Sequence, residues 1–236
     1  MHERVIGILG GMGPEATADL FLEIIRLTPA RNDQDHVPVL IFSNPHIPDR
    51  TRAILGAGED PLPALIETAK ALERGGAGIV TVPCNAAHHY VPMIQEKIGI
   101  PILNMIEETC RALKEELSGI RSVGLLAATG TIRSRVYSAA CSRHELELLV
   151  PEDTEQERVH AAIFEVKAGT RGEATRKFFQ SAGAALVSKG AQAIILGCTE
   201  IPLAFNSHEA QYLSVNPTRI LAQAAVDWAL GKRVER

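Results

Sequence analysis

Two cysteines lie in segments whose residue types could carry chemistry. Cys84 is part of VPCNAAHH (82–89), and Cys198 is part of AIILGCTE (193–200). Each follows an apolar run that is typical of a buried strand, and each precedes polar residues that are typical of the start of a helix. A thiol in such a place can be a small buried hydrophobe, a metal ligand or a group that moves protons.

The two cysteines occupy equivalent places in two similar halves of the chain. RVIGILGGMG (4–13) aligns with RSVGLLAATG (121–130), and ALERGGAGIVTVPCN (71–85) aligns with ALVSKGAQAIILGCT (185–199), so that the two cysteines pair. Repeats of this length indicate the duplication of an α/β unit rather than a short-period solenoid. Because both copies keep the thiol, we favour a function for both cysteines.

A zinc site would need more ligands than this pattern supplies. His88 and His89 follow Cys84 at a spacing that zinc sites use, and Cys198 could add a further ligand. No fourth ligand is evident, however, and no carboxylate has a suitable spacing. We therefore predict no metal, and we expect His88 to support the start of the helix after Cys84.

Strand and helix patterns alternate along the chain. Apolar runs predict strands at 4–9, 37–43, 78–82, 101–104, 121–127, 146–150 and 192–196. Helical spacing predicts helices at 14–28, 63–75, 105–117, 131–142, 153–168, 172–189 and 217–230, and one from Ala86 that Pro92 is expected to kink. The alternation predicts an α/β fold with parallel sheets covered by helices. We predict one domain at 1–117 with 215–236, and a second at 118–214.

Both cysteines are predicted just beyond the carboxyl end of a strand, where open α/β sheets bind ligands. If the two domains face each other about a pseudo-twofold axis, the thiols project into one cleft from opposite sides. A thiolate on one side and a thiol on the other can then remove a proton from a carbon atom and return one to its opposite face. A helix N-terminus beside each thiol would lower the thiol pKa and so favour the reactive thiolate.

Other candidate binding residues are a glycine loop and three cations. GGMGPEA (10–16) contains G-x-G-x-x-A after a strand, which can indicate a dinucleotide site. The next strand ends without the acidic residue that would hold a ribose, so a small carboxylate held by backbone N–H groups is favoured. Arg50 and Arg52 can form a carboxylate clamp. Lys167 ends a predicted helix, where it can either cap the helix or bind an anion.

Composition bounds the partners and the compartment. The chain has 236 residues with 46% hydrophobic and 4% aromatic residues and a formal net charge of −4, so no nucleic-acid partner is expected. No apolar run approaches the roughly 18 residues of a transmembrane helix, and MHERVIGILGGMGPE does not resemble a signal peptide. We expect a cytoplasmic protein that does not bind membranes.

The cysteine pattern agrees with that compartment. No C-x-x-C pair is present, and a chain of this size does not need disulfides, so we predict free thiols, with two disulfides as the less favoured alternative. Cys110, in MIEETCRAL, and Cys141, in VYSAACSR, lack the symmetry of the other pair and fall in predicted helices. We interpret these two residues as structural.

Several motifs together resemble the aspartate/glutamate racemase family: GILGGMGPEAT, the NPHIPDRT loop, VPCNAAH, GLLAATGT, the EVKAG turn and GCTEIPL. They occur in the family's order over nearly the whole chain, and GMGPEAT points to the aspartate-racemase branch. The resemblance implies two flavodoxin-like domains with the active site between them. It also implies racemisation of an acidic amino acid, aspartate or glutamate, without pyridoxal phosphate or any other cofactor. We further expect a homodimer.

The resemblance also implies roles for individual residues. Cys84 and Cys198 would be the proton donor and acceptor, and Arg50 and Lys167 would bind the substrate carboxylate. The remaining residues expected at the substrate are Met12, Thr51, Arg52, Asn85, Ala86, Thr129, Thr131, Thr199 and Glu200, of which Asn85 and Thr199 would orient the thiols.

One departure from the family pattern bears on the substrate. The family usually has Cys-Asn-Thr-Ala-His where this chain has Cys-Asn-Ala-Ala-His, so Ala86 replaces a hydroxyl group. One substrate hydrogen bond is then either lost or taken over by water. Other functions stay open: a related two-cysteine hydantoin racemase or maleate isomerase, or a non-catalytic carboxylate-binding protein. Arg50 and Lys167 favour a dicarboxylic amino acid, and the two intact cysteines favour an enzyme.

Overall fold

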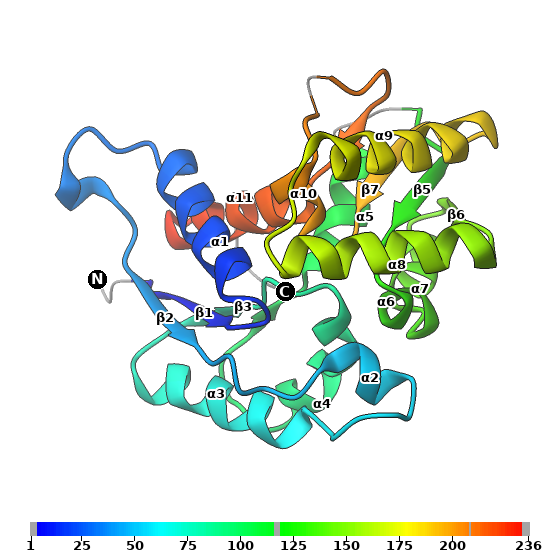
Figure 1. The fold of residues 1–236 in the computed structure, drawn as a ribbon. Helices are drawn as coiled ribbons and strands as arrows, with labels where there is room; N and C mark the ends of the chain where they lie inside the picture. The colour runs from blue at the N-terminus through cyan, green and yellow to red at the C-terminus, as the bar shows by residue number, and fades with distance from the viewer. Residues whose placement is uncertain (1–3, 116–118, 208, 233–236) are drawn as a thin grey trace. The chain divides into compact units, whose positions relative to one another are not determined.

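The computed structural model describes residues 4–115, 119–207 and 209–232. The chain forms two compact units: Met1–Glu108 together with Thr218–Arg236, and Thr109–Pro217 (Figure 1). Each unit is built on a parallel sheet of four strands, which confirms the predicted α/β fold. The predicted limits of the two domains, at 117/118 and 214/215, stay a prediction.

The two sheets have the same strand order. In the first, β1 (Ile6–Gly10), β2 (Val39–Ser43), β3 (Ile79–Thr81) and β4 (Ile102–Leu103) are arranged β2-β1-β3-β4. In the second, β5 (Ser122–Leu126), β6 (Glu147–Leu149), β7 (Ala193–Leu196) and β8 (Ser214–Val215) are arranged β6-β5-β7-β8. Each sheet therefore repeats the other strand for strand, as the duplication predicts.

The pairing of the central strands follows the sequence repeat residue by residue. Ile6 pairs with Ile79 across β1 and β3, and Val123 pairs with Ala193 across β5 and β7. The sequence repeat aligns these same residues, Ile6 with Val123 and Ile79 with Ala193. The strands that lead to the two cysteines, β3 and β7, thus pair with β1 and β5 in the same register. Each cysteine therefore follows its own sheet at an equivalent point.

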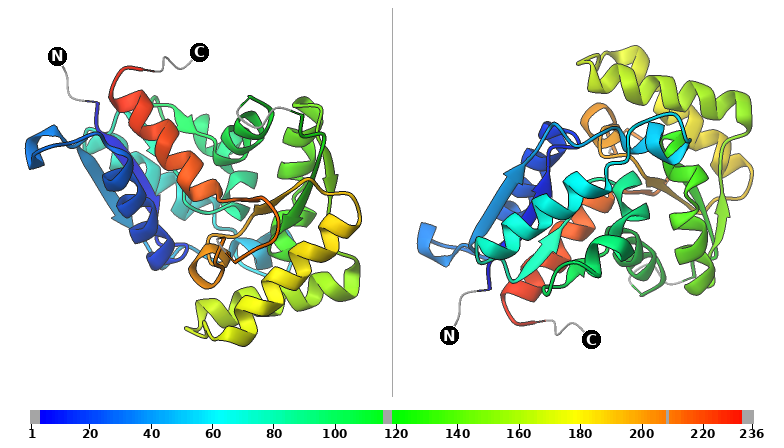
Figure 2. Two further views of the ribbon diagram at one scale, coloured as in Figure 1. Left: turned by 90° about the horizontal axis from the view of Figure 1, so that it is seen from above. Right: turned by 90° about the horizontal axis from the view of Figure 1, so that it is seen from below.

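The first sheet is covered on both faces. α1 (Pro14–Leu27) and α11 (Pro217–Ala229) lie side by side on one face, and α3 (Leu62–Arg74) and α4 (Val91–Gln95) lie on the other (Figures 1 and 2). Ile6 and Ile8 belong to the core under α1 and α11, whereas Leu9 belongs to the core under α3 and α4. Alternate side chains of β1 therefore enter opposite cores, as the pleat of a strand requires.

In the second unit, α8 (Asp153–Lys167) and α9 (Glu173–Ser188) pack together as a helical pair (Figure 1). They share a core with the ends of β5 and β7 that includes Val159, Phe179, Leu126 and Leu196. This packing fixes the carboxyl ends of the two central strands. Within the described residues, no helix of either unit is long and apolar enough to cross a lipid bilayer.

Two predicted helices are each divided in the structure. The helix expected at 131–142 is two helices, α6 (Thr129–Arg133) and α7 (Val136–Arg143), because Arg135 between them has a left-handed backbone with φ of 59°. The helix expected from Ala86 is a 3-10 turn, η2 (Ala86–His89), followed by α4. Pro92 stands in the first turn of α4, where its missing N–H group costs no helical hydrogen bond, so it does not kink a longer helix.

Several single-turn elements were not predicted. Arg50 begins a short helix, α2 (Arg50–Ile54), where we expected a loop, and the Asp49 carboxylate caps it by accepting from the Arg52 backbone N–H at 2.8 Å. The others are η1 (Asp33–Asp35), α10 (Ile201–Ala204) and β8. A helix of a single turn is too short to show the helical period, so α2, η1 and α10 leave no periodic pattern in the sequence. The remaining helix, α5 (Met105–Glu115), begins where it was predicted, and its expected last residues, 116 and 117, lie outside the described residues.

Candidate active site

Cys84 lies in a tight turn between β3 and η2. Its backbone N–H donates to the Val82 carbonyl at 2.8 Å, and its own carbonyl accepts from the Ala87 N–H at 3.2 Å. The side chain is 7% exposed and belongs to the core under α3 and α4. The segment that follows is a single 3-10 turn, so the longer helix whose N-terminus was expected to activate the thiol is absent from this point of the described chain.

His88 holds this turn from behind. Its Nε2 atom accepts from the Met105 backbone N–H at 3.0 Å, which requires the proton to sit on Nδ1, and Nδ1 then donates to the Cys84 carbonyl at 2.9 Å. Burial lowers the pKa of the imidazole to about 4, so the ring is neutral near pH 7. Both ring nitrogens are therefore committed to backbone groups, and His88 supports the turn at Cys84, where we had expected it to support the start of a helix.

Cys198 lies at the equivalent point after β7, with different neighbours. Its Sγ atom donates to Glu200 Oε2 at 2.9 Å, and the Thr199 hydroxyl donates to the same oxygen at 3.4 Å. All three side chains are buried. The Thr199 hydroxyl thus donates to the Glu200 carboxylate rather than to the Cys198 sulfur. The turn therefore gathers two donors around one buried acidic group.

Lys167 joins this group from the last turn of α8. Its Nζ atom lies 3.8 Å from Glu200 Oε1, and it also stands 4.9 Å from the centre of the Phe164 ring. The Lys167 side chain is 30% exposed, whereas that of Glu200 is 6% exposed. Lys167, Glu200 and Cys198 thus form one connected polar group within the second unit. Sequence reasoning named all three residues but predicted no contact between them.

Arg50 is a buried cation held by carbonyl groups. Its guanidinium donates to the carbonyl oxygens of Ile47 at 3.1 Å, Pro48 at 3.0 Å and Met12 at 3.4 Å. Within the described residues it makes no ion pair with a carboxylate, and its Nε atom is buried without a hydrogen-bond partner. A buried positive charge that no protein carboxylate neutralises is suited to an anionic ligand.

Arg52, two residues further along α2, has different surroundings. Its side chain is exposed, donates to the Ala57 carbonyl at 3.3 Å and lines an open surface hollow of about 710 Å³ with Asp49 and Glu59. Thr51 between the two arginines is buried. The two guanidinium groups thus have separate partners, and the clamp formed by both arginines stays a prediction.

The glycine loop after β1 uses a backbone donor for its own structure. The Gly11 N–H donates to the Thr17 hydroxyl at 2.8 Å, and Met12 is buried in the core under α3 and α4. Gly11 has a φ of +96°, and a Cβ atom there would overlap the backbone of Asn44. The glycine is therefore needed for close packing against the end of β2.

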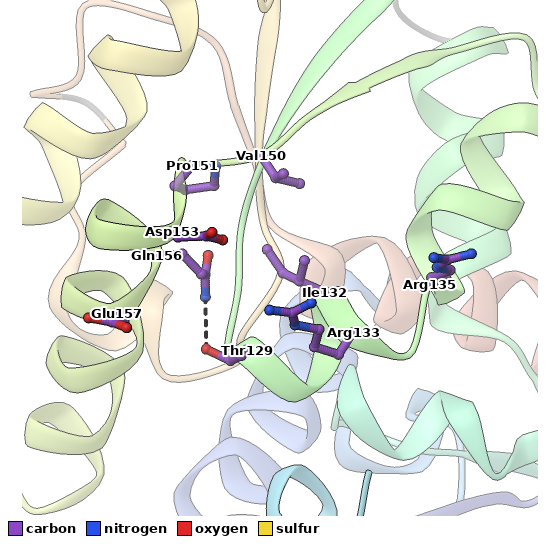
Figure 3. A pocket seen from close by; sticks show the side chains of 9 residues that line it. All are labelled: Thr129, Ile132, Arg133, Arg135, Val150, Pro151, Asp153, Gln156 and Glu157. Carbon is purple, nitrogen blue, oxygen red and sulfur yellow. Dashed lines mark hydrogen bonds between the residues drawn. The ribbon is translucent and has the colours of Figure 1, made fainter. Parts of the chain in front are cut away.

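Thr129, the residue of the second unit that aligns with Met12, begins α6 and lines a cavity of about 500 Å³. Figure 3 shows Ile132 and Arg133 of α6 on one side of this cavity and Asp153, Gln156 and Glu157 of α8 on the other, with Arg135 farther away. Thr131, a neighbour of Thr129 in α6, is almost completely buried.

Two residues that sequence reasoning missed hold Thr129 in place. Gln156 donates through Nε2 to the Ala127 carbonyl at 2.9 Å and to the Thr129 hydroxyl at 3.3 Å. His160 accepts from the Thr129 N–H at 3.3 Å through Nδ1. Gln156 and His160 are four residues apart and so share one face of α8. Polar residues at this spacing on a helix with a buried face are the signal that could have found them.

In the part of the chain that the structure describes, the cysteines lie apart from any possible metal-binding group. Among the described residues, no group of three or more His, Cys, Asp or Glu side chains is arranged to hold a metal ion. All four cysteines are free thiols, and the Sγ atoms of Cys110 and Cys141 lie 3.7 Å apart in the interior of the second unit.

Comparison with known proteins identifies the family. The model of the Asp/Glu/Hydantoin racemase family matches residues 9–225, which include every candidate site residue named above. The chain belongs to this family. Membership makes it a racemase, and its two parallel sheets are those of the racemase fold.

Similar proteins align with this racemase over almost its whole length. The broad specificity amino-acid racemase RacX of Bacillus subtilis (strain 168) is 28% identical over 226 residues, which are 94% of this chain and 96% of RacX. The structure of Picrophilus torridus aspartate racemase has a TM-score of 0.84 and 29% identity, with 98% and 96% of the two chains covered. An aspartate racemase homologue from Pyrococcus horikoshii OT3 has a TM-score of 0.78 and 25% identity, with 96% and 99% covered.

Proposed function

We propose that this racemase interconverts L- and D-aspartate by moving a proton at the α-carbon, with Cys84 and Cys198 as the acid and base and without a cofactor. The observation that carries the proposal is the equivalence of the two thiols. Each is free and buried, and each directly follows the carboxyl end of a central strand in matching sheet registers. An aspartate racemase and a broad specificity amino-acid racemase are among the similar proteins, which supports an amino acid as the substrate.

The mechanism requires the two sulfurs to face a common cleft from opposite sides. Their separation should be roughly 7–10 Å, because each reacting sulfur stands about 3–3.5 Å from the carbon between them. In one direction a thiolate removes the α-proton while the opposed thiol protonates the other face, and the roles are exchanged for the other enantiomer. The net reaction consumes no proton, since one is taken and one is given in each turnover.

The intermediate carries negative charge that the protein must stabilise. The α-proton of an amino acid is weakly acidic, and no cofactor is proposed that could accept the electrons. Arg50 and Lys167 supply positive charge for the substrate carboxylates and the developing carbanion. The buried guanidinium of Arg50, which lacks a carboxylate partner among the described residues, favours a dicarboxylic substrate. Asn85 and Thr199, next to the cysteines, and Met12, Thr51, Thr129 and Thr131 complete the proposed pocket.

Hydantoin racemisation and maleate isomerisation use similar paired thiols, and Ala86 leaves room for a wider range of substrates. The test follows the α-proton directly. Each aspartate enantiomer is incubated with the protein in D2O, and loss of the α-proton signal is measured by NMR, with inversion followed on a chiral column. The same assay is run with glutamate, neutral amino acids, a hydantoin and maleate. Exchange and inversion fastest for aspartate support the proposal, whereas turnover of maleate or a hydantoin alone contradicts it.

We further propose that the racemase is a homodimer in the cytoplasm. Four free thiols suit a reducing compartment. Sedimentation equilibrium of the reduced protein tests the assembly, and a monomer at micromolar concentration contradicts it. Fractionation of cells that express the tagged chain tests the location.

A further inference from the structure

The polar group around Cys198 has no counterpart at the other cysteine. Glu200 lies two residues after Cys198, and its Oε2 atom accepts the Cys198 S–H at 2.9 Å. The residue two after Cys84 is Ala86, whose methyl group cannot accept a hydrogen bond. The two turns are otherwise equivalent in their sheets, so this carboxylate is a chemical difference between the two halves of the proposed site.

A buried carboxylate in this position has a definite effect on the thiol. As an acceptor it stabilises the protonated sulfur, because the S–H group is the donor of the hydrogen bond. If the sulfur lost its proton, two negative charges would face each other at hydrogen-bond distance in a site from which water is largely excluded. Both effects favour the thiol over the thiolate at Cys198.

Lys167 and Thr199 both contact the Glu200 carboxylate. The ammonium group of Lys167 lies 3.8 Å from Oε1, and the Thr199 hydroxyl donates to Oε2 at 3.4 Å. Oε2 therefore accepts from two neighbouring donors while Oε1 faces the lysine.

Cys84 has the opposite surroundings within its own unit. Its carbonyl is held by the neutral ring of His88, and Ala86 stands where the acidic group would be. Neither neighbour places a negative charge against the sulfur. These neighbours of Cys84 therefore include no counterpart of the Glu200 carboxylate that contacts the Cys198 sulfur.

We propose that Glu200 is a positioning residue that keeps Cys198 protonated, so that the resting enzyme holds Cys198 as the proton donor and leaves Cys84 to act as the base. This inference rests on the proposed two-thiol function. When Cys84 removes the α-proton, the Cys198 proton goes to the opposite face of the carbon. The enzyme then carries a thiol at Cys84 and a thiolate beside Glu200. It returns to the resting form when solvent returns a proton to Cys198 and takes one from Cys84.

Rates in the two directions do not test this idea, because L- and D-aspartate are equally stable and kcat/KM must be equal for both. The reactivity of the thiols does test it. The unmodified protein is alkylated with iodoacetamide across a range of pH, and the modification of each cysteine is followed by peptide mass spectrometry. We expect the pH midpoint for Cys198 to lie above that for Cys84. A midpoint for Cys198 at or below that of Cys84 overturns the proposal, and this comparison needs no variant.

The Glu200→Gln variant removes the charge and keeps the size of the side chain. We expect alkylation of Cys198 to become about tenfold faster at pH 7, which corresponds to a midpoint about one pH unit lower, while Cys84 is unchanged. The kcat/KM profile for aspartate should shift in the same direction. Glu200→Asp, which keeps a carboxylate, should restore most of the wild-type profile. An unchanged Cys198 midpoint in Glu200→Gln contradicts the proposal.

The matched control is Glu152→Gln. Glu152 also pairs with a lysine, Lys189, at 2.5 Å, but its side chain is 82% exposed. This variant should leave both midpoints unchanged. Circular dichroism reports that each variant is folded. If no amino acid exchanges its α-proton but the Cys198 midpoint falls in Glu200→Gln, the proposed function fails while the effect of Glu200 on the thiol stands.

Discussion

The turns at Cys84 and Cys198 descend from the same repeat but are stabilised in different ways. At Cys84 the support comes from His88, a neutral ring that links the turn to the first residue of α5. At Cys198 it comes from Glu200, a buried acidic group that contacts the sulfur itself. The strand, the register and the thiol are common to both turns, whereas the chemistry around the sulfur differs. The duplication thus preserved the positions of the thiols and let their surroundings diverge.

The loops after the first strand of each sheet differ in a similar manner. The repeat aligns Gly11 with Ala128 and Met12 with Thr129. Gly11 has a positive φ and packs against the Asn44 backbone, whereas Ala128 has an extended backbone with φ of −63°. Met12 is buried in a core, whereas Thr129 lines a cavity. One copy of this segment packs closely against a neighbouring backbone, and the other leads directly into α6 with Thr129 at the cavity.

The largest expected effect concerns the two thiols. Cys84→Ala and Cys198→Ala should each abolish racemisation in both directions, a loss of about 10³-fold or more, because every turnover needs one acid and one base. The remaining thiol should still exchange the α-proton of one enantiomer without inversion, which NMR in D2O detects. By family resemblance, we expect Cys84 to act on the D-enantiomer and Cys198 on the L-enantiomer.

Cys110→Ala and Cys141→Ala are the controls for this prediction and should remain active. Full racemase activity in either Cys84→Ala or Cys198→Ala, with the fold checked by circular dichroism, would refute the two-thiol mechanism.

The two glycine-loop positions should respond very differently to a methyl group. Gly11→Ala should lower the free energy of unfolding by about 4 kcal/mol, because the new Cβ atom is strained at positive φ and overlaps the Asn44 backbone. The reverse change at the aligned position of the second unit, Ala128→Gly, should lower the free energy of unfolding by only about 0.5–1 kcal/mol, through backbone entropy. Urea unfolding of both variants measures the difference. Equal losses would show that the two loops are packed alike.

The support of the Cys84 turn should depend on pH. The folded His88 ring has a pKa of about 4, whereas the unfolded ring has its ordinary value of about 6.5, so the unfolded state binds a proton first as pH falls. The contribution is complete above about pH 6.5 and is lost as pH falls toward 4. The loss of this contribution should lower the free energy of unfolding by about 2–3 kcal/mol between pH 7.5 and 4.5.

The free energy of unfolding of His88→Gln should fall by about 2–3 kcal/mol less than that of the wild type between pH 7.5 and 4.5. Urea unfolding of both proteins at the two pH values measures this difference. His89→Gln is the matched control, since His89 is exposed, and it should follow the wild type. An identical pH dependence in wild type and His88→Gln would mean that the ring does not titrate with folding.

The smallest expected effect separates the two arginines of α2. Arg50→Ala should reduce kcat/KM for aspartate roughly 30-fold more than it reduces exchange of the alanine α-proton, a difference of about 2 kcal/mol. The reason is that the lost contact is to the second carboxylate, which alanine lacks. Arg52→Ala should leave that ratio unchanged, since its guanidinium is exposed and bonds to Ala57. Equal losses for aspartate and alanine in Arg50→Ala would assign Arg50 to the fold alone.

Local patterns predict the elements that extend over several turns or over a buried strand. The helices at α1, α3, α8 and α9 and the central strands β1, β3, β5 and β7 agree with the predictions to within a few residues. The sequence repeat also predicts the register of the central strands. These features follow from local sequence because side-chain periods of 3.6 and 2 residues, and the alignment of two copies, do not depend on distant contacts.

The sequence by itself determined the fold class, the duplication and the two strand ends at which thiols stand. Only the tertiary structure decided what those thiols and cations contact. His88 meets Met105 across 17 residues, Lys167 meets Glu200 across the length of α9 and β7, and Arg50 meets the Met12 carbonyl 38 residues away. A periodic pattern states which face of an element a residue occupies. It does not state which group from elsewhere in the chain will reach that face, because this depends on how the elements pack and on the rotamer that the packing allows.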